Sequence, residues 1–562
     1  MKRDQKRLIT IFLAFALFYI AILLKLFYWQ VVKAEGLRLA GRDQSSLSLV
    51  TTAKRGDILF HDNFPLATNK ISYLLYANPK KVDSTDSYSK LLSPILQVDA
   101  ASISARLSEN LYWVSLQSRL SFDQRKQIEA LKLNALGFEQ QTERNYPEAS
   151  LAAHLVGFVG KNQDGEDQGY FGIEGFYDRQ LRGRPGSTYL IKDAVGNPIL
   201  TEIREDKKID GRNLVTSIDR SIQYMADTEL KKGLEKYGAE GATVIIMQTK
   251  TGKILAASSY PKFDPQKYWE YDGKYYTSPI VSNLFEPGST FKVLVMAAGI
   301  DSGLVTPDTK CDDCAGPVEQ DGFSIKTWND EYIPNINMTQ VIQHSDNTGM
   351  VFVAKKLGID RFLSYLKNFG IGTQTGIDIQ GEVTEELRSP RKWKDIDLMT
   401  ASFGQGISIT PIQLIASVNA IANGGKLMKP MVVEKILTPD GKTINVEPQV
   451  EKQVVSSATA KVMTWMMVNA VENGEAKFAK IPNYHIAGKT GTAQIPVAGH
   501  YDPTNTNASF IGFFPAEDPQ ITMLVIVNRP QSSIYGAETA APTFFAIARD
   551  IIQYYNIEPS KQ

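Results

Sequence analysis

Residues 286–298 read EPGSTFKVLVMAA and decide how the rest of the chain is interpreted. The Pro287-Gly288 turn ends an extended segment, and the apolar run after it predicts a buried helix. Ser289 then lies in the first helical turn, and Lys292 lies three residues on, over the same face. A serine needs a nearby base to act as a nucleophile, and a helix N-terminus can stabilise an oxyanion. Taken alone, the pair is better explained as an N-cap serine beside a solvated lysine.

Two further motifs follow in the chain. Ser345-Asp346-Asn347 lies between predicted helices at about 338–344 and 348–357, and Lys489-Thr490-Gly491-Thr492 lies in a strand-like segment. In this order, S-x-x-K, S-D-N and K-T-G resemble the motif set of class A β-lactamases and penicillin-binding proteins. Because the three motifs occur together and in this order, chance does not explain the Ser289-x-x-Lys292 pair.

The segments on either side of these motifs predict one domain whose first and last strands belong to the same sheet. A polar linker near 205–212 precedes strands and a helix, and a mainly helical stretch follows from about 280 to 470. Strands and a terminal helix then return, so we expect an α+β domain (an α/β sandwich) over 211–562 with one antiparallel sheet. The predicted elements are strands 214–218, 242–248, 253–258, 484–494, 509–514 and 521–528, and helices 221–237 and 541–555.

Residues 29–210 predict a mixed α/β region of short strands and loops. Helices are expected near 98–108 and 122–134, the second with Ser121 as its N-cap. Glycines then punctuate the chain between 165 and 186. We expect this region to form a separate domain ahead of the one over 211–562.

The N-terminus predicts a membrane anchor. A basic tail, residues 1–7, precedes an apolar segment over 8–28, which is about 31 Å long as a helix and can span a bilayer. Lys25 can extend its ammonium to the far interface, where Tyr28 and Trp29 fit an aromatic belt. The basic tail should stay cytoplasmic, which places the remainder outside the membrane. A cleaved signal peptide is the alternative, but the apolar run exceeds the usual ~7–15 residues and no A-x-A-like site follows.

The composition excludes several classes of protein. Lys and Arg number 61, as do Asp and Glu, so nothing indicates a nucleic-acid partner. The chain has two cysteines, Cys311 and Cys314, five histidines and no H-E-x-x-H, so no metal site is expected. No cofactor is expected either. In an oxidising compartment the cysteine pair can form a disulfide, and we interpret it as a loop staple or as two free thiols.

Over about residues 10–555 the chain resembles a class B penicillin-binding protein, a monofunctional peptidoglycan D,D-transpeptidase. The sequence departs from that family at 61–64, where His-Asp-Asn-Phe replaces Asp-Arg-x-Gly, and the cysteine pair is not a general feature of the family. The resemblance implies a β-lactamase/D,D-peptidase-like fold for the transpeptidase domain over 211–562 and a pedestal (dimerisation-like) domain over 29–210. The matching motifs are Arg55-Gly56-Asp57-Ile58, Leu66-Ala67, Arg144-Asn145-Tyr146-Pro147, 154–158, Gly172-Ile173-Glu174, 251–256, 403–406 and Ala540-Ala541-Pro542.

The resemblance also implies a catalytic mechanism. Ser289 would attack the penultimate D-alanine carbonyl of a stem peptide, and Lys292 would take its proton. The pKa of Lys292 must then fall from about 10.4 toward 7, through burial and the charge of Lys489. Ser345 would pass a proton to the leaving D-alanine, and an amine of a neighbouring strand would resolve the acyl-enzyme.

The same resemblance assigns the substrate-binding groups. Asn347 would hydrogen-bond the substrate backbone, and the strand motif would hold the terminal carboxylate. The backbone N–H groups of Ser289 and Thr492 would form the oxyanion hole. The implied substrate-binding residues are Asn347, Lys489, Thr490, Gly491 and Thr492.

The implied partners are peptidoglycan stem peptides, β-lactam antibiotics, the inner membrane, a polytopic membrane glycosyltransferase, and divisome or elongasome proteins. The Arg144-x-Tyr-Pro and Ala-Ala-Pro motifs favour the division type over the elongation type. A β-lactamase or D,D-carboxypeptidase on the same fold is an alternative, although it has little use for a pedestal and an anchor. A catalytically idle regulator or β-lactam sensor is another, and the intact motifs argue against it.

Overall fold

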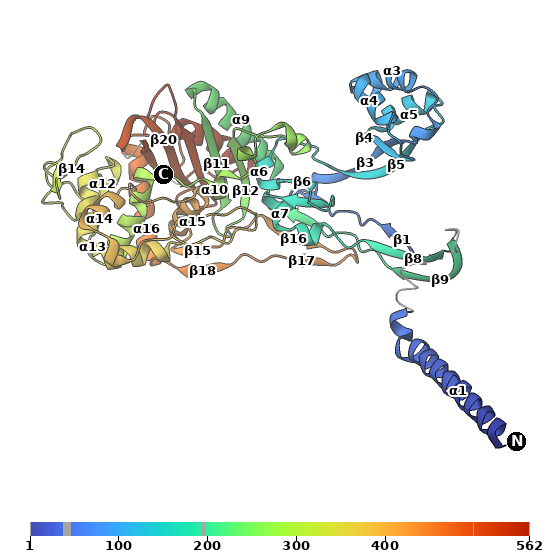
Figure 1. Cartoon of the computed structure of the whole chain (residues 1–562). Coiled ribbons are helices and arrows are strands. Elements are labelled where there is room, and N and C mark those ends of the chain that lie inside the picture. The colour runs from blue at the N-terminus through green and yellow to red at the C-terminus, as the bar shows by residue number, and fades with distance from the viewer. Residues whose placement is uncertain (1, 38–45, 193–197, 498–499, 561–562) are drawn as a thin grey trace. The chain divides into compact units, whose positions relative to one another are not determined.

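The chain folds into two compact units, and the larger one holds all three motifs (Figure 1). The computed structural model describes residues 2–37, 46–192, 198–497 and 500–560. The smaller unit comprises Met1–Lys54 and Gly183–Asp210, and the larger unit comprises Arg55–Arg182 and Gly211–Gln562.

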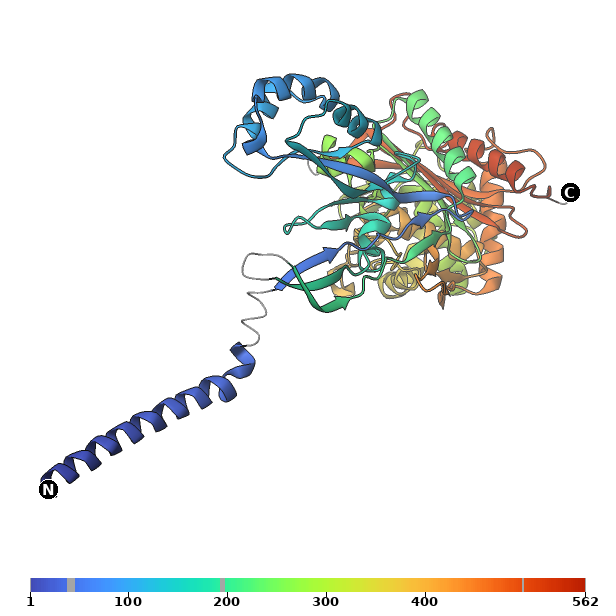
Figure 2. The same cartoon turned by 90° about the vertical axis from the view of Figure 1, so that its right-hand side faces the viewer.

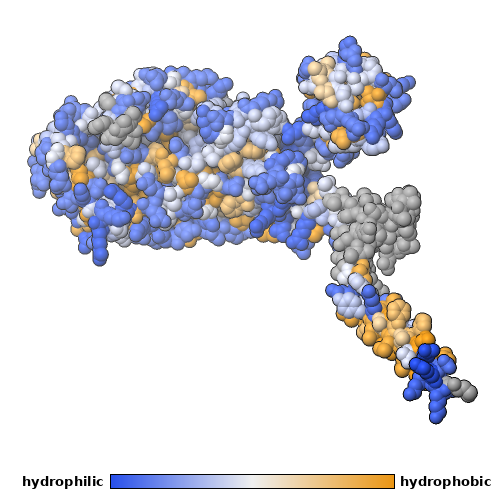
Figure 3. Space-filling view, in the orientation of Figure 1, coloured by the Kyte–Doolittle hydropathy of each residue, from blue (hydrophilic) through white to orange (hydrophobic). Residues whose placement is uncertain are grey.

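The smaller unit begins with the predicted apolar helix. Helix α1 (Lys2–Phe27) runs into a π-helical turn, Tyr28–Val32, and this helix is long and apolar enough to cross a membrane. None of the side chains of α1 is buried, and apolar residues cover most of the helix beyond its charged N-terminal end (Figure 3). An antiparallel sheet in the order β1-β8-β9 completes the unit. Its strands are β1 (Ser46–Thr51), β8 (Gly186–Lys192) and β9 (Pro198–Asp206).

A five-stranded antiparallel sheet forms the centre of the larger unit, in the order β12-β11-β21-β20-β19. Both faces are covered, which explains why β11 reads as a continuous apolar run. Val244 and Ile246 pack in the core with α9 and α17, whereas Ile245 and Met247 pack in the core with α11 and α15. Figure 2 shows α9 beside α17. The bounds are β11 (Gly241–Gln248), β12 (Ile254–Tyr260), β19 (Ala487–Val497), β20 (His500–Phe514), β21 (Ile521–Asn528), α9 (Arg220–Tyr237) and α17 (Ala540–Tyr554).

The helical layer on the second face contains the elements that carry the first two motifs. Helix α11 is buried from Lys292 to Gly299, and every residue of α15 is buried, as expected for helices that are apolar all round. The predicted α/β sandwich is therefore confirmed. The helices between the strands are α10 (Pro279–Ser282), α11 (Lys292–Asp301), α12 (Met338–Gln343), α13 (Asn347–Asn368), α14 (Asp395–Ala401), α15 (Pro411–Ala422) and α16 (Ser457–Asn473).

The N-terminal part of the larger unit is built on the 13-residue strand β3 (Pro65–Ala77). This strand pairs with β4 and β5 beside three short helices. Helix α5 begins at the predicted N-cap, Ser121, which forms a capping box with Gln124. Helix α3 was not predicted, and Pro94 inside it explains why. The bounds are α3 (Thr85–Leu96), α4 (Ala100–Leu107), α5 (Phe122–Ala130), β2 (Ile58–Leu59), β4 (Val114–Leu120), β5 (Leu136–Asn145), β10 (Asn213–Thr216), β16 (Val433–Leu437) and β17 (Thr443–Asn445).

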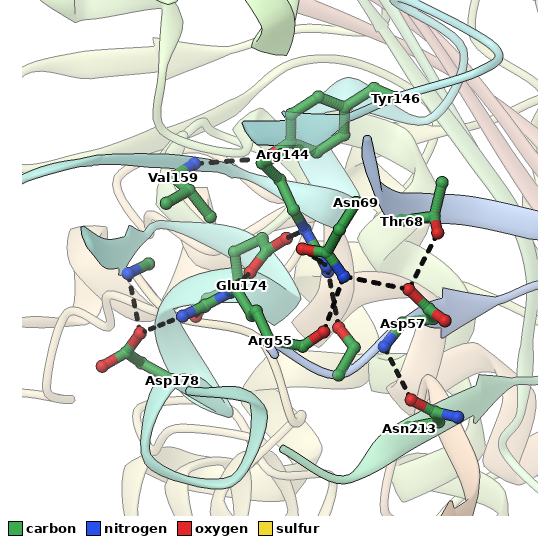
Figure 4. Close-up of polar contacts among 12 residues, drawn as sticks. Arg55, Asp57, Thr68, Asn69, Arg144, Tyr146, Val159, Glu174, Asp178 and Asn213 are labelled. Atoms are coloured by element: carbon green, nitrogen blue, oxygen red, sulfur yellow. Dashed lines mark hydrogen bonds and ion pairs between the residues drawn. The ribbon is translucent and has the colours of Figure 1, made fainter. Parts of the chain in front are cut away.

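Three motifs that are far apart in the sequence meet in one buried ion-pair network (Figure 4). Glu174 is fully buried, and its two carboxylate oxygens lie 2.6 Å from Arg55 Nη2 and 2.6 Å from Arg144 Nε. Arg55 Nη1 lies 2.8 Å from Asp178 Oδ1. The network therefore explains why the motifs around Arg55, Arg144 and Glu174 carry charged residues.

The short elements of the larger unit are α6 (Ala153–Val156), α7 (Gly172–Phe176), α8 (Asp178–Leu181), β6 (Phe158–Lys161), β7 (Asp167–Tyr170), β13 (Val318–Gln320), β14 (Phe323–Ile325), β15 (Lys426–Met428) and β18 (Val450–Gln453).

Candidate active site

Ser289 lies in a 3-10 turn, Gly288–Phe291, that leads directly into α11. Gly288 has a φ of +56°, and its N–H donates to the carbonyl oxygen of Gly404 at 3.1 Å. The Thr290 hydroxyl is buried and donates to the Pro287 carbonyl at 2.7 Å. The side chain of Ser289 is partly exposed. One hydrogen bond thus ties the turn to Gly404 and another lies within it, and Ser289 itself remains partly exposed.

Lys292 is completely buried behind this turn. Its Nζ donates to the Ser345 carbonyl oxygen at 2.6 Å and to Asn347 Oδ1 at 2.7 Å, and it lies 3.3 Å from Ser345 Oγ. Burial, and then the charge of Lys489, lowers the pKa of Lys292 to about 7, against the charges of two nearby carboxylates. A large share of Lys292 is therefore neutral near pH 7, as a general base requires.

The Ser345-Asp346-Asn347 motif joins α12 to α13. Ser345 has a φ of +56°, which turns the chain at this point. Asp346 is the N-cap of α13, and its Oδ1 accepts the N–H of Gly349 at 2.8 Å. The Nδ2 of Asn347 donates to the Lys326 carbonyl at 2.8 Å. The side-chain amide of Asn347 is therefore held at its oxygen by Lys292 and at its nitrogen by the Lys326 carbonyl.

The third motif lies on β19, which is an edge strand of the central sheet. A Cβ atom on Gly491 would lie 2.3 Å from Ser509 Oγ and 2.9 Å from Thr290 Cγ2, so only glycine lets the strand pack against the turn that carries Ser289. Lys489 is buried, and its Nζ donates to Thr490 Oγ1 at 3.0 Å. The structure thus packs the Lys489–Thr492 segment of β19 against the turn that carries Ser289, and it surrounds the Lys292 amine with groups of Ser345 and Asn347.

Further groups complete the site, and two of them, Glu475 and Gly536, lie in segments that the sequence did not single out. Thr490 Oγ1 donates to Glu475 Oε2 at 2.8 Å. The N–H of Gly536 donates to Thr492 Oγ1 at 3.1 Å, and the N–H of Gly406 donates to Glu286 Oε1 at 3.0 Å. Glu286 and Gly406 belong to motifs that the sequence did single out. The other two groups come from segments without a motif, so no pattern pointed to them.

Cys311 and Cys314 form a disulfide, with their Cα atoms 5.6 Å apart. Both side chains are buried, and the Cys311 N–H donates to the Ile336 carbonyl at 2.9 Å, just before α12. The interpretation as a loop staple is the one that the structure supports. Among the described residues, no cluster of three or more His, Cys, Asp or Glu side chains is placed to hold a metal ion.

Two family models match the chain. The model described as the penicillin binding protein transpeptidase domain matches residues 242–553, and that of the penicillin-binding protein dimerisation domain matches residues 50–216. The chain belongs to the penicillin-binding protein transpeptidase family. Its two domains make it a class B penicillin-binding protein, as the motifs predicted.

Curated relatives resemble this penicillin-binding protein over nearly its whole length. Stage V sporulation protein D of Bacillus subtilis is 32% identical over 565 residues, which cover 99% of this chain and 87% of the relative. Peptidoglycan D,D-transpeptidase FtsI of Escherichia coli is 28% identical over 577 residues, which cover 99% and 94%. The prediction of a serine-type D,D-transpeptidase that crosslinks the cell wall is confirmed, and the apolar helix α1 makes this protein membrane-anchored.

Solved structures share the fold of this penicillin-binding protein. A peptidoglycan synthetase of Bifidobacterium adolescentis superposes with a TM-score of 0.74 at 24% identity, and the match covers 92% of this chain and 98% of that one. Penicillin-binding protein 3 of Mycobacterium tuberculosis, in complex with ampicillin, has a TM-score of 0.71 at 25% identity, over 92% and 98%. The predicted fold class is confirmed.

Proposed function

We propose that Ser289 is the acylated nucleophile of this transpeptidase and that peptidoglycan stem peptides are its acyl donors. The Ser289 hydroxyl gives its proton to the neutral amine of Lys292 as its oxygen bonds to the carbonyl carbon of the penultimate D-alanine. The C–N bond to the terminal D-alanine then breaks, and the leaving nitrogen receives a proton through Ser345 Oγ. An amine of a neighbouring strand attacks the ester and gives up a proton to Lys292, and the Ser289 oxygen takes this proton as its bond to the acyl carbon breaks.

The substrate-binding roles follow from the same arrangement. Asn347 is proposed to hydrogen-bond the substrate backbone, and Lys489 to hold the terminal carboxylate with Thr490 and Thr492. Gly491 lets the strand lie against the nucleophile turn. The oxyanion hole is proposed to consist of the backbone N–H groups of Ser289 and Thr492.

The burial of Lys292 beside Ser345 and Asn347 is the observation that carries this proposal. A buried amine whose pKa lies near 7 suits a proton acceptor and has no evident use in a purely structural role.

The test is incubation of the full-length protein with a labelled penicillin, followed by mass spectrometry of its peptides. A lasting adduct on Ser289, absent from Ser289→Ala, supports the transpeptidase. Rapid turnover of the penicillin supports a β-lactamase or carboxypeptidase, and lack of an adduct supports the idle regulator. An adduct on another residue contradicts the assignment of Ser289.

We further propose the placement of the chain in the cell envelope. Residues 1–7 are cytoplasmic, 8–28 span the membrane, 29–210 form the pedestal, and 211–562 form the catalytic domain outside it, beside a polytopic glycosyltransferase of the division machinery. Protease added to spheroplasts should digest nearly the whole chain, and protection of the C-terminal half would overturn this topology. A fluorescent fusion at the septum supports the division role, and one along the side wall supports elongation.

A further inference from the structure

The carboxylate of Glu475 contacts the strand motif directly. Thr490 Oγ1 donates to Glu475 Oε2 at 2.8 Å. The Nζ of Lys489 donates to the same Thr490 hydroxyl oxygen at 3.0 Å and to the Thr490 carbonyl at 3.1 Å. A hydroxyl has one proton to donate, so the proton of Thr490 is committed to Glu475 and its oxygen accepts from Lys489.

The backbone that carries Glu475 is held tightly at the end of α16. A Cβ atom on Gly474 would lie 2.2 Å from the Ala470 carbonyl oxygen and 2.7 Å from the Gln343 carbonyl oxygen. The Nε2 of Gln343 donates to the Asn473 carbonyl at 3.3 Å. Only glycine at 474 therefore lets α16 end against α12. This contact directs Glu475, the next residue, toward β19. The side chain of Glu475 is partly exposed, so its carboxylate can also reach water.

The charge of Glu475 acts on both lysines of the site. Lys489 and Lys292 are buried, and the negative charge of Glu475 raises the pKa of each against the effect of burial. Glu475 is also the same kind of group as the terminal carboxylate of the substrate. One donor that the proposed function assigns to the substrate, the Thr490 hydroxyl, is therefore already used by a carboxylate of the chain, and Lys489 donates to that same hydroxyl oxygen.

We propose that Glu475 is a specificity-determining residue of the carboxylate subsite, where it competes with the terminal carboxylate of the acyl donor for the Lys489–Thr490 pair. This inference rests on the proposed function. An incoming carboxylate accepts the hydrogen bond of the Thr490 hydroxyl and pairs with the Lys489 ammonium. Glu475 then turns toward water. A ligand without a carboxylate meets no such competition. Glu475 thereby lowers the affinity for carboxylate ligands. Such a ligand must then make correct contacts elsewhere in the site in order to bind.

The test compares a penicillin that carries its free carboxylate with the methyl ester of the same penicillin. Second-order acylation rate constants are measured by stopped flow on the full-length wild type and on Glu475→Gln, which keeps the side-chain shape and removes the charge. We expect the rate ratio of carboxylate to ester to rise about 3–30-fold in Glu475→Gln. A change in the base Lys292 acts on both ligands alike, so the ratio isolates the subsite.

Two further variants complete the design. Glu472→Gln is the matched control, because Glu472 lies on the same segment and pairs with Lys480 at 2.8 Å; its ratio should equal that of the wild type. Glu475→Ala provides the same readout should Glu475→Gln unfold, which thermal melting will show. An unchanged or lower ratio in the folded Glu475 variant overturns the inference. Lack of a Ser289 adduct in the wild type with either ligand instead overturns the proposed function.

Discussion

The Nζ atom of Lys292 lies 2.7 Å from Oδ1 of Asn347, which comes 55 positions later in the chain. The second short contact of the amine, at 2.6 Å, is to the Ser345 carbonyl oxygen. A neutral amine has two N–H donors and one lone pair. These two acceptors can satisfy both N–H donors of the neutral amine, which leaves its lone pair to accept a proton. The contacts therefore support the role of base that we propose for Lys292.

We expect acylation to depend on the protonation of Lys292. Its pKa of about 7 means that the amine is charged and inactive below pH 7 and neutral above it, so the acylation rate should rise tenfold per pH unit on the acid side and level off above pH 8. Stopped-flow rates with a chromogenic β-lactam from pH 5 to 9 will measure this profile.

Asn347→Asp should move that profile to higher pH. A carboxylate in contact with Nζ favours the ammonium, so the pKa of Lys292 rises and acylation near pH 7 falls about 10–100-fold. The rate should recover in part at alkaline pH, unlike a loss caused by poor substrate binding. Equal losses at all pH values would contradict this assignment.

A third prediction concerns the buried network of Arg55, Arg144 and Glu174. Glu174→Gln removes the charge between Arg55 and Arg144, so Arg144 loses this carboxylate partner at 2.6 Å and Arg55 keeps only Asp178. Breaking a buried pair costs about 3–5 kcal/mol, so the thermal unfolding midpoint of the detergent-solubilised protein should fall. Glu139→Gln is the control, because Glu139 is exposed on β5 and its loss should have little effect.

The sequence alone predicted the central sheet well, because strands buried on both faces show as unbroken apolar runs. β21 occupies the range 521–528 that was predicted, and β11 begins only one residue early. The start of β20 was missed because residues 500–508 are polar and contain Pro503. Their strand conformation comes from pairing with β19, where Asp502 lies opposite Ile495. β3 was missed for a similar reason, since Asn69 and Lys70 interrupt its apolar pattern.

The candidate site shows the same division between local pattern and tertiary contact. Ser289 and Lys292 could be assigned a shared helical face from their spacing alone. The partners of Lys292 could be named only through the family resemblance, since no local rule connects position 292 with 345. Glu475 had no signal at all, because its place depends on the close approach of Gly474 to the Gln343 carbonyl.

Gly491→Ala should separate the strand motif from the nucleophile. The added methyl group would overlap Ser509 Oγ at 2.3 Å and crowd Thr290, so β19 must shift away from the turn. We expect acylation to fall about 10²-fold, as for a displacement near 1 Å. The thermal midpoint should change little, because β19 is an edge strand. Gly441→Ala offers a control in an exposed turn, where no atom lies within 4 Å of the added group, although its φ of +82° will cost some stability.

The last prediction distinguishes the two buried lysines. Arginine keeps its proton at any working pH, so Lys292→Arg should abolish acylation from pH 6 to 10. Lys489→Arg keeps the positive charge that we assign to the carboxylate subsite, and it should retain measurable acylation, reduced about 10–1000-fold by the misplaced charge. Rates with a chromogenic β-lactam across this pH range decide between the two roles. Survival of Lys292→Arg, or an equal and total loss in both variants, would show that the base and the carboxylate-binding cation have been assigned wrongly.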